Sequence, residues 1–129
     1  MQSWKRWSPY VLSAVRIVAA LLFMEHGLQK LFGFPAAGPP MTIIIWVQAL
    51  IEVVGGIALL FGAYTRPVAF ILSGDMAVAY FMSHFPRSFY PAVNGGDAAI
   101  LYCFLFLYLA CEGGGAWSVD SGVSRPKVT

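Results

Sequence analysis

Four side chains that can exchange protons or donate hydrogen bonds lie close together in the first long apolar stretch of the sequence. Within Val11–Phe34 these are Glu25, His26, Gln29 and Lys30. At about 100° per residue they share one side of a helix, and apolar residues fill the other. Because an ionisable group in a membrane costs roughly 2.5–3.5 kcal/mol, we expect this polar side to face the protein interior.

Acidic residues recur in or beside the later apolar stretches. Glu52 shares a helix face with Gln48 and the Gly55-Gly56 pair, and that face is expected to pack inward. Asp75 is the one strongly polar residue inside the third stretch, and Asp97 opens the fourth. At about 1.5 Å per residue, these helices place the acids in the outer half of a membrane. We therefore predict that the acids converge there.

The charges of these stretches do not balance. Arg16 and Lys30 stand against four acids, so two negative charges remain if every group is ionised. A low-dielectric interior resists such an excess. Carboxyl protonation, a charged His26 or a bound cation would neutralise it. Each of these outcomes gives the acids a task beyond packing.

The composition of the chain indicates that its helices lie in a lipid bilayer. The 129 residues are 59% hydrophobic and only 11% charged, and the mean hydropathy is +0.72. Soluble domains carry roughly 25% charged residues, so this composition indicates an integral membrane protein. The net charge of +2, without a Lys/Arg-rich run, argues against nucleic acid as a partner. A signal peptide over Val11–Met24 is disfavoured because Arg16 interrupts it.

The apolar stretches predict an all-α fold, a membrane four-helix bundle with four antiparallel transmembrane helices in up-down order. Residues 1–112 would form the four-span domain, and residues 113–129 a polar cytoplasmic tail, loosely ordered from Ala116 onward. Lys and Arg are more frequent on the side of the two termini, which predicts that both ends are cytoplasmic. Helices are expected over Ser8–Phe32 and about Pro67–Ser83, and within the apolar runs Met41–Tyr64, which ends in a turn over Gly62–Pro67, and Ala98–Cys111.

The order and spacing of several short motifs resemble the DoxX family of small bacterial inner-membrane proteins. The resemblance reaches Glu112, with one departure, in that the last acid is Asp97 where such proteins also use Glu. It implies a four-helix bundle in the cytoplasmic membrane of a bacterium. It also implies redox biology, since family members include a subunit of a thiosulfate:quinone oxidoreductase and a membrane partner of oxidative-stress enzymes. The motifs are Arg16, His26–Gly33, Glu52 with Gly55-Gly56, Gly62–Arg66 and Asn94–Asp97.

With this resemblance, the leading hypothesis is a redox-linked subunit that binds a quinone or similar small molecule in an outward-facing polar pocket. It would be at most a quinone-linked oxidoreductase subunit, because neither metal-ligand spacing nor a nucleotide-binding glycine pattern is visible. Glu25, His26 and Glu52 would exchange protons. The ligand-binding candidates are Arg16, Gln29, Lys30, Asp75, Asn94, Asp97, Phe104 and Tyr108, the last two flanking a ring.

Other functions stay open at this point. The protein could be a membrane scaffold that recruits redox or oxidative-stress partners through its loops and tail. It could be a small ion or solute conduit, although Arg16 alone is strongly polar in the inner half of the first helix. The polar pairs could also serve only to hold the bundle together. The expected partners are the lipid bilayer, proteins of a redox complex and a second copy of the chain.

Overall fold

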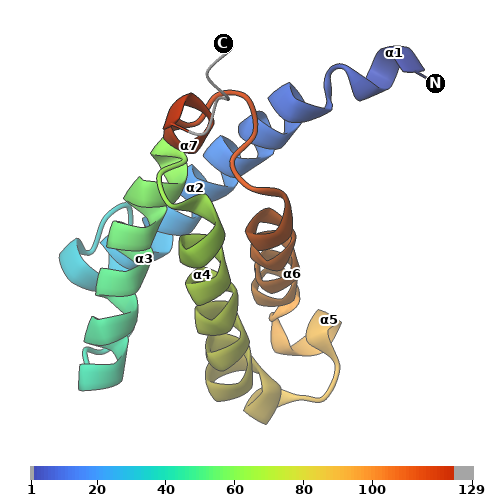
Figure 1. The fold of residues 1–129 in the computed structure, drawn as a ribbon. Helices are drawn as coiled ribbons and strands as arrows, with labels where there is room; N and C mark the ends of the chain where they lie inside the picture. The colour runs from blue at the N-terminus through green and yellow to red at the C-terminus, as the bar shows by residue number, and fades with distance from the viewer. Residues whose placement is uncertain (1, 124–129) are drawn as a thin grey trace.

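The computed structural model describes residues 2–123, and these form helices joined by short loops (Figure 1). No strand occurs among the described residues, which confirms the all-α prediction. The elements are α1 (Gln2–Lys5), α2 (Ser8–Phe32), α3 (Ile43–Phe61), α4 (Thr65–Ala79), the π-helical turn η1 (Tyr80–His84), the 3₁₀ turn η2 (Phe85–Arg87), α5 (Pro91–Asn94), α6 (Asp97–Glu112) and α7 (Val119–Val123).

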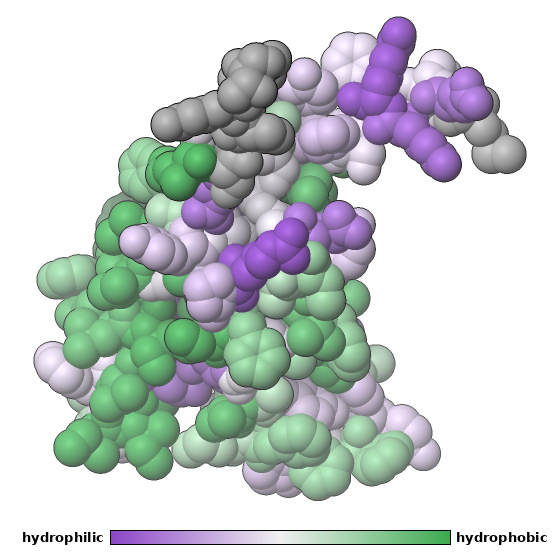
Figure 2. Space-filling view, in the orientation of Figure 1, coloured by the Kyte–Doolittle hydropathy of each residue, from purple (hydrophilic) through white to green (hydrophobic). Residues whose placement is uncertain are grey.

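Three helical segments of the described chain are long and apolar enough to cross a membrane: Ser8–Phe32, Ile43–Phe61 and Thr65–Arg87. Hydrophobic side chains cover much of the α3 and α4 surface in Figure 2, and strongly hydrophilic ones gather near α1. α6 has 16 residues and extends about 24 Å, less than the roughly 30 Å of a hydrocarbon core. The structure thus supports three spans and leaves the fourth a prediction.

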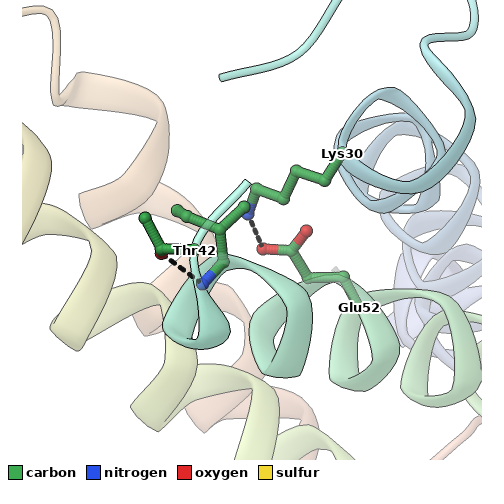
Figure 3. A network of polar contacts seen from close by, with 4 residues as sticks. Lys30, Thr42 and Glu52 are labelled. Carbon is green, nitrogen blue, oxygen red and sulfur yellow. Dashed lines mark hydrogen bonds and ion pairs between the residues drawn. The ribbon is translucent and has the colours of Figure 1, made fainter. Parts of the chain in front are cut away.

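Glycines end the first two long helices, as the sequence indicates. Gly33 and Gly62 adopt left-handed φ values of 66° and 69°, and the Gly33 amide donates to the carbonyl of Gln29. This conformation is favourable for glycine because it has no Cβ. At the start of α3, the Thr42 hydroxyl accepts a hydrogen bond from the Ile45 amide at 3.2 Å (Figure 3). Local sequence signals therefore set these ends.

The helices pack as α2 on α3, α3 on α4 and α4 on α6. Their shared core includes Phe23 and Phe106, whose ring centroids lie 5.0 Å apart in an edge-on arrangement. Small residues bring the backbones close: a Cβ at Gly27 would lie 2.8 Å from the Val53 side chain. At Gly55 a Cβ would lie 2.8 Å from Leu72. The predicted inward face of α3 is confirmed, since Gln48, Glu52 and Gly56 are buried.

Two predicted boundaries differ most from the structure. The third helix was expected to end at Ser83, but helical turns continue to Arg87 through η1 and η2. Pro86 fits there because it occupies the first turn of η2, where its missing amide costs no hydrogen bond. The tail was expected to be loosely ordered from Ala116, yet Val119–Val123 forms α7 and is tied to the rest of the chain. Residues 124–129 of that tail lie outside the described part.

Candidate functional site

The packed face of α2 differs from the predicted one. Arg16, Ala20, Phe23 and Gly27 are buried, and Lys30 continues this stripe. Glu25 and His26 are exposed in the isolated chain, so the prediction that they face the interior is wrong. Close helix contact selects small and apolar groups, and these occupy the side of α2 opposite to Glu25. The prediction is confirmed for Lys30, but polarity alone misplaced Glu25 and His26.

Lys30 forms an ion pair with Glu52, which joins the end of α2 to the middle of α3 (Figure 3). The Lys30 Nζ to Glu52 Oε1 distance is 2.7 Å, and the Glu52 side chain is 0% exposed against 14% for Lys30. Within residues 2–123 this is the only salt bridge. Replacing either partner alone would destabilise the fold, because the charge of the other would remain buried without a counter-charge.

Asp75 of α4 and Gln48 of α3 complete the cluster around this ion pair. Asp75 lies within electrostatic range of Glu52, Lys30 and Gln48. Both Gln48 and Asp75 are buried. Among the described residues, no hydrogen-bond partner is found for Glu52 Oε2 or Asp75 Oδ2. Buried polar atoms are nearly always paired in folded proteins, and Glu52 and Asp75 lie within hydrogen-bonding reach of each other. The two oxygens can therefore share a proton between them or bind a ligand.

A groove between α3 and α4 leads to this cluster from the membrane-facing surface. Its volume is about 360 Å³, within the range of small-molecule sites. Gln48 and Asp75 are its polar residues, and the rest of its wall is apolar. The apolar lining residues are Ile43, Ile44, Val47, Ile51, Ile71, Gly74 and Val78. The groove has the apolar walls and few polar groups typical of a site for an apolar ring with polar substituents.

Arg16 takes no part in the Lys30 cluster. Its guanidinium is 0% exposed and donates to backbone carbonyls: to Trp117 at 2.8 Å, to Leu60 at 3.4 Å and to Gly114. Ser13, one turn earlier, donates to the Gly114 carbonyl at 3.0 Å and accepts from the Trp117 amide at 2.9 Å. The predicted ligand-binding residue Arg16 thus ties the C-terminal segment to α2.

Asp120 of α7 holds the start of α4 in the same cap. Its carboxylate accepts hydrogen bonds from the Tyr64 and Thr65 amides, each at 2.8 Å. Partial burial acts to raise the pKa of Asp120, but the bonds from Thr65 and Tyr64 and the nearby Arg16 charge outweigh it and lower the pKa below its ordinary value. The carboxylate therefore replaces the missing side-chain cap of α4.

Asn94, predicted to bind a ligand, instead organises the loop before α6. Its amide donates to the Ser88 carbonyl at 2.9 Å and to the Tyr80 hydroxyl at 3.2 Å, and its Oδ1 accepts from the Gly96 amide at 2.8 Å. The side chain is 1% exposed. These contacts use the side chain internally, so Asn94 is not available to the groove.

The other predicted ligand residues are spread over the surface. Asp97 is exposed in the first turn of α6, where a carboxylate favours the helix dipole. Phe104 and Tyr108 are 65% and 54% exposed on α6, so they do not enclose a ring within this chain. Gln29 is half-buried.

Gln48 is the site residue that the candidate set lacked. It lies one turn before Glu52 on the inward face of α3, and that spacing was the signal that could have identified it. The aromatic residues that pack inward from α6 are Tyr102 and Phe106, against Phe23. Their positions depend on how α6 meets α2, which helix periodicity alone does not define.

The cluster can hold a proton or bind a polar group. With Lys30, Glu52 and Asp75 all ionised it carries one excess negative charge, and its free oxygens are acceptors. Lys30 and Gln48 supply donors. In the described chain no three His, Cys, Asp or Glu side chains lie close enough to hold a metal ion together. The arrangement suits proton exchange with a neutral molecule that has both donors and acceptors.

Comparison with known proteins agrees with this architecture. Residues 11–85 match the DoxX family. An uncharacterized protein of Haemophilus influenzae is 42% identical over 94% of this chain and 96% of its own length. Inner membrane protein YqjF of Escherichia coli is 32% identical over 81% of this chain and 85% of its own length. No solved structure matches. This membrane protein belongs to the DoxX family.

Proposed function

We propose that the protein is a redox-linked membrane subunit that binds a quinone, or a similar small molecule, at the cluster of Lys30, Gln48, Glu52 and Asp75. The observation that supports this most is the buried, unpartnered carboxylate oxygen of Asp75 in the wall of an apolar groove, with a second such oxygen, that of Glu52, in the same cluster. A quinone combines an apolar ring with two oxygens that alternate between acceptor and donor. The groove and its polar floor offer both kinds of contact.

The residues divide the work of binding by their chemistry. Lys30 or the Gln48 amide would donate to a quinone carbonyl oxygen. Asp75 or Glu52 would accept the hydroxyl proton of the reduced form, and Lys30 would stabilise whichever carboxylate stays ionised. Electrons would pass between the quinone and a partner protein of the redox complex. Glu25 and His26 are left out of this proton group because both lie on the exposed side of α2.

The proposal includes a fourth span and a location in the bacterial inner membrane. α1 and α7 lie at the same end of the molecule (Figure 1), which an even number of crossings requires. α6 packs along α4 and would supply the fourth crossing, with the bilayer thinning to fit its 16 residues. Both termini would then be cytoplasmic, as the Lys and Arg distribution favours. A periplasm-active reporter fused after Thr129 should be silent, and an active reporter would contradict this orientation.

Binding of decylubiquinone to purified protein in nanodiscs tests the proposed site. The wild type should bind it saturably, and Glu52→Gln, which keeps a hydrogen-bond acceptor but cannot exchange a proton, should still fold. We expect that variant to lose redox-linked activity in cells while retaining part of the binding. Asp97→Asn, at an exposed acid in the first turn of α6 outside the groove, is the matched control and should behave like the wild type. No saturable binding by the wild type would reject the proposal.

Recruitment of a soluble partner is a second candidate, favoured by a concavity at the cap end. It has a volume of about 780 Å³ and is lined by residues that include Lys5, Arg66, Glu112 and Asp120. A wall that mixes charged side chains of both signs with apolar ones suits a protein loop better than a lipid tail. Replacing Lys5 and Arg66 by Glu should abolish co-purification of such a partner and leave decylubiquinone binding unchanged. The reverse outcome would reject this candidate.

An ion or solute conduit is disfavoured, because an apolar layer separates the polar contacts of Arg16 from the cluster around Lys30. Arg16 lies fourteen residues before Lys30, about 21 Å along α2. The core between them consists of apolar side chains, including Phe23, Leu72 and Phe106, each 0% exposed. A continuous polar path for ions would have to cross this layer.

A further inference from the structure

One exposed face of α2 carries a regular coiled-coil pattern. Its residues recur with alternating spacings of four and three along the whole helix. This is the a/d repeat by which two helices pack along a shared seam. More than a third of each apolar side chain in this face is exposed: Val11 57%, Val15 38%, Val18 54% and Leu22 47%. We call this set the α2 seam, and it consists of Val11, Val15, Val18, Leu22, Glu25 and Gln29.

The outer part of the α2 seam is polar where lipid would otherwise surround it. Glu25 belongs to the seam and His26 flanks it, and both are exposed. Within residues 2–123 neither side chain forms a hydrogen bond or a salt bridge. Glu25 lies about 10 Å inside the end of α2 at Phe32, which is within the hydrocarbon depth. Ionisable groups at that depth almost always face protein or water.

We infer that the α2 seam is the contact between two copies of this chain, related by a two-fold axis along the membrane normal. Copies in one membrane share an orientation, so such an axis sets the two α2 helices parallel and in register. In a parallel pair, each seam side chain fills a hole formed by four residues of the facing helix. For Glu25 that hole consists of Leu22, Glu25, His26 and Gln29 of the second copy.

The polar part of the α2 seam can also pair with itself. Glu25 of each copy meets both Glu25 and His26 of the other. The two facing carboxyl groups share one proton, and two reciprocal acid–imidazole contacts form across the axis. Gln29 follows at an a position, where one polar residue typically fixes register and selects two helices over other arrangements. The Val and Leu side chains of the inner half supply the apolar packing. A lipid tail would satisfy that inner half only, which is why we favour a second copy as the occupant.

Disulfide trapping in membranes tests the inferred contact. In a Cys103→Ala, Cys111→Ala background, Val18→Cys and Leu22→Cys should each give a disulfide-linked dimer under mild oxidation. Phe70→Cys is the matched control, since Phe70 is 65% exposed on α4, away from α2, and should stay monomeric. Equal yields at Val18 and Phe70, or no dimer at either seam position, would overturn the inference. So would a trapped species that contains a different protein.

A charge exchange tests the polar layer separately from the apolar one. Glu25→Lys replaces the two facing carboxyl groups by two ammonium groups, which cannot share a proton and which leave His26 without an acid partner. It should weaken dimerisation in detergent about tenfold or more. Glu25→His combined with His26→Glu restores the complementary pair and should recover most of that loss, with helicity by circular dichroism unchanged throughout. Lack of rescue in a folded double variant would overturn the pairing. Decylubiquinone binding is read in the same samples, so failure of the seam and failure of the proposed function are distinguishable.

Discussion

Two positive charges on one helix have opposite environments. Arg16 is wholly buried at the cap end of α2 and donates to the carbonyls of Gly114, Trp117 and Leu60. Lys30 lies near the other end and is joined to Glu52, with Asp75 beside them. Backbone carbonyl groups do not titrate and belong to the chain itself, so the contacts of Arg16 do not change with protonation or with a ligand. Carboxyl groups can take up and release protons, so the Lys30 end can respond to a ligand.

The contrast shows that a charge inside a membrane protein indicates function only when its partners can change. Both residues carry the same cost of insertion. At Arg16 that cost is offset by contacts that tie three segments of the chain together. At Lys30 it leaves two unpartnered carboxylate oxygens within a site that opens to a groove. The following variants test whether this division is correct, from the largest expected effect on stability to the smallest.

Arg16→Met should lower the free energy of unfolding most, by about 3 kcal/mol, because it leaves buried carbonyls of the C-terminal segment without donors. Chemical denaturation in detergent, followed by circular dichroism, measures this. Arg6→Met, an exposed arginine before α2, is the control and should change little. If Arg16→Met were as stable as the control, the cap would not depend on this residue.

Glu52→Leu should lower the free energy of unfolding by about 2 kcal/mol, because it strands the Lys30 ammonium in a buried site. Glu52→Gln keeps an acceptor for Lys30 and should cost less than about 1 kcal/mol while abolishing redox-linked activity. The same denaturation series and a growth assay under oxidative stress separate the two. A fully active and stable Leu variant would contradict both a structural and a chemical role for Glu52.

Asp120→Ala should lower the free energy of unfolding by about 1 kcal/mol near neutral pH, the usual cost of losing a helix cap. Its folded-state pKa lies below the ordinary 3.8, so its stabilisation is present above that value and is lost as the pH falls through the folded pKa. The difference between wild type and variant should therefore vanish in strong acid. A difference that stays constant down to low pH would show that the carboxylate charge is not what stabilises α4.

Asp75→Asn should change the free energy of unfolding least, by about 0.5 kcal/mol or less, because no donor among the described residues pairs with its Oδ2. Its effect on decylubiquinone affinity should instead be large. Unfolding and binding measured on one preparation give both values. A large loss of stability would show that Asp75, like Arg16, makes contacts that stabilise the fold.

The fold was largely predictable because membrane helices are encoded locally. The long apolar stretches predicted α2, α3 and α4, and Gly33 and Gly62 predicted the ends of α2 and α3. The short helix α7 was not predictable from its polar sequence. Its order comes from the distant contacts of Ser13, Arg16 and Asp120, which no local pattern contains.

The candidate site was predictable only in part. Depth along the helices correctly brought Lys30, Glu52 and Asp75 together. The helical wheel misplaced Glu25 and His26 because it grouped polar residues, whereas packing of α2 follows its small residues, such as Gly27. An exposed polar side and a buried polar pocket look the same on a wheel. Only the facing helix distinguishes them.

Photolabelling with an azido-substituted quinone, mapped by mass spectrometry on the protein in nanodiscs, tests the central claim most directly. We expect light-dependent labels on α3 and α4 beside the groove, at positions such as Val47, Gly74 and Val78. Excess decylubiquinone should compete them away, and Asp75→Asn should reduce them. Labels confined to Phe104 and Tyr108 on the outside of α6, or labels that decylubiquinone does not displace, would contradict binding at the Lys30 cluster.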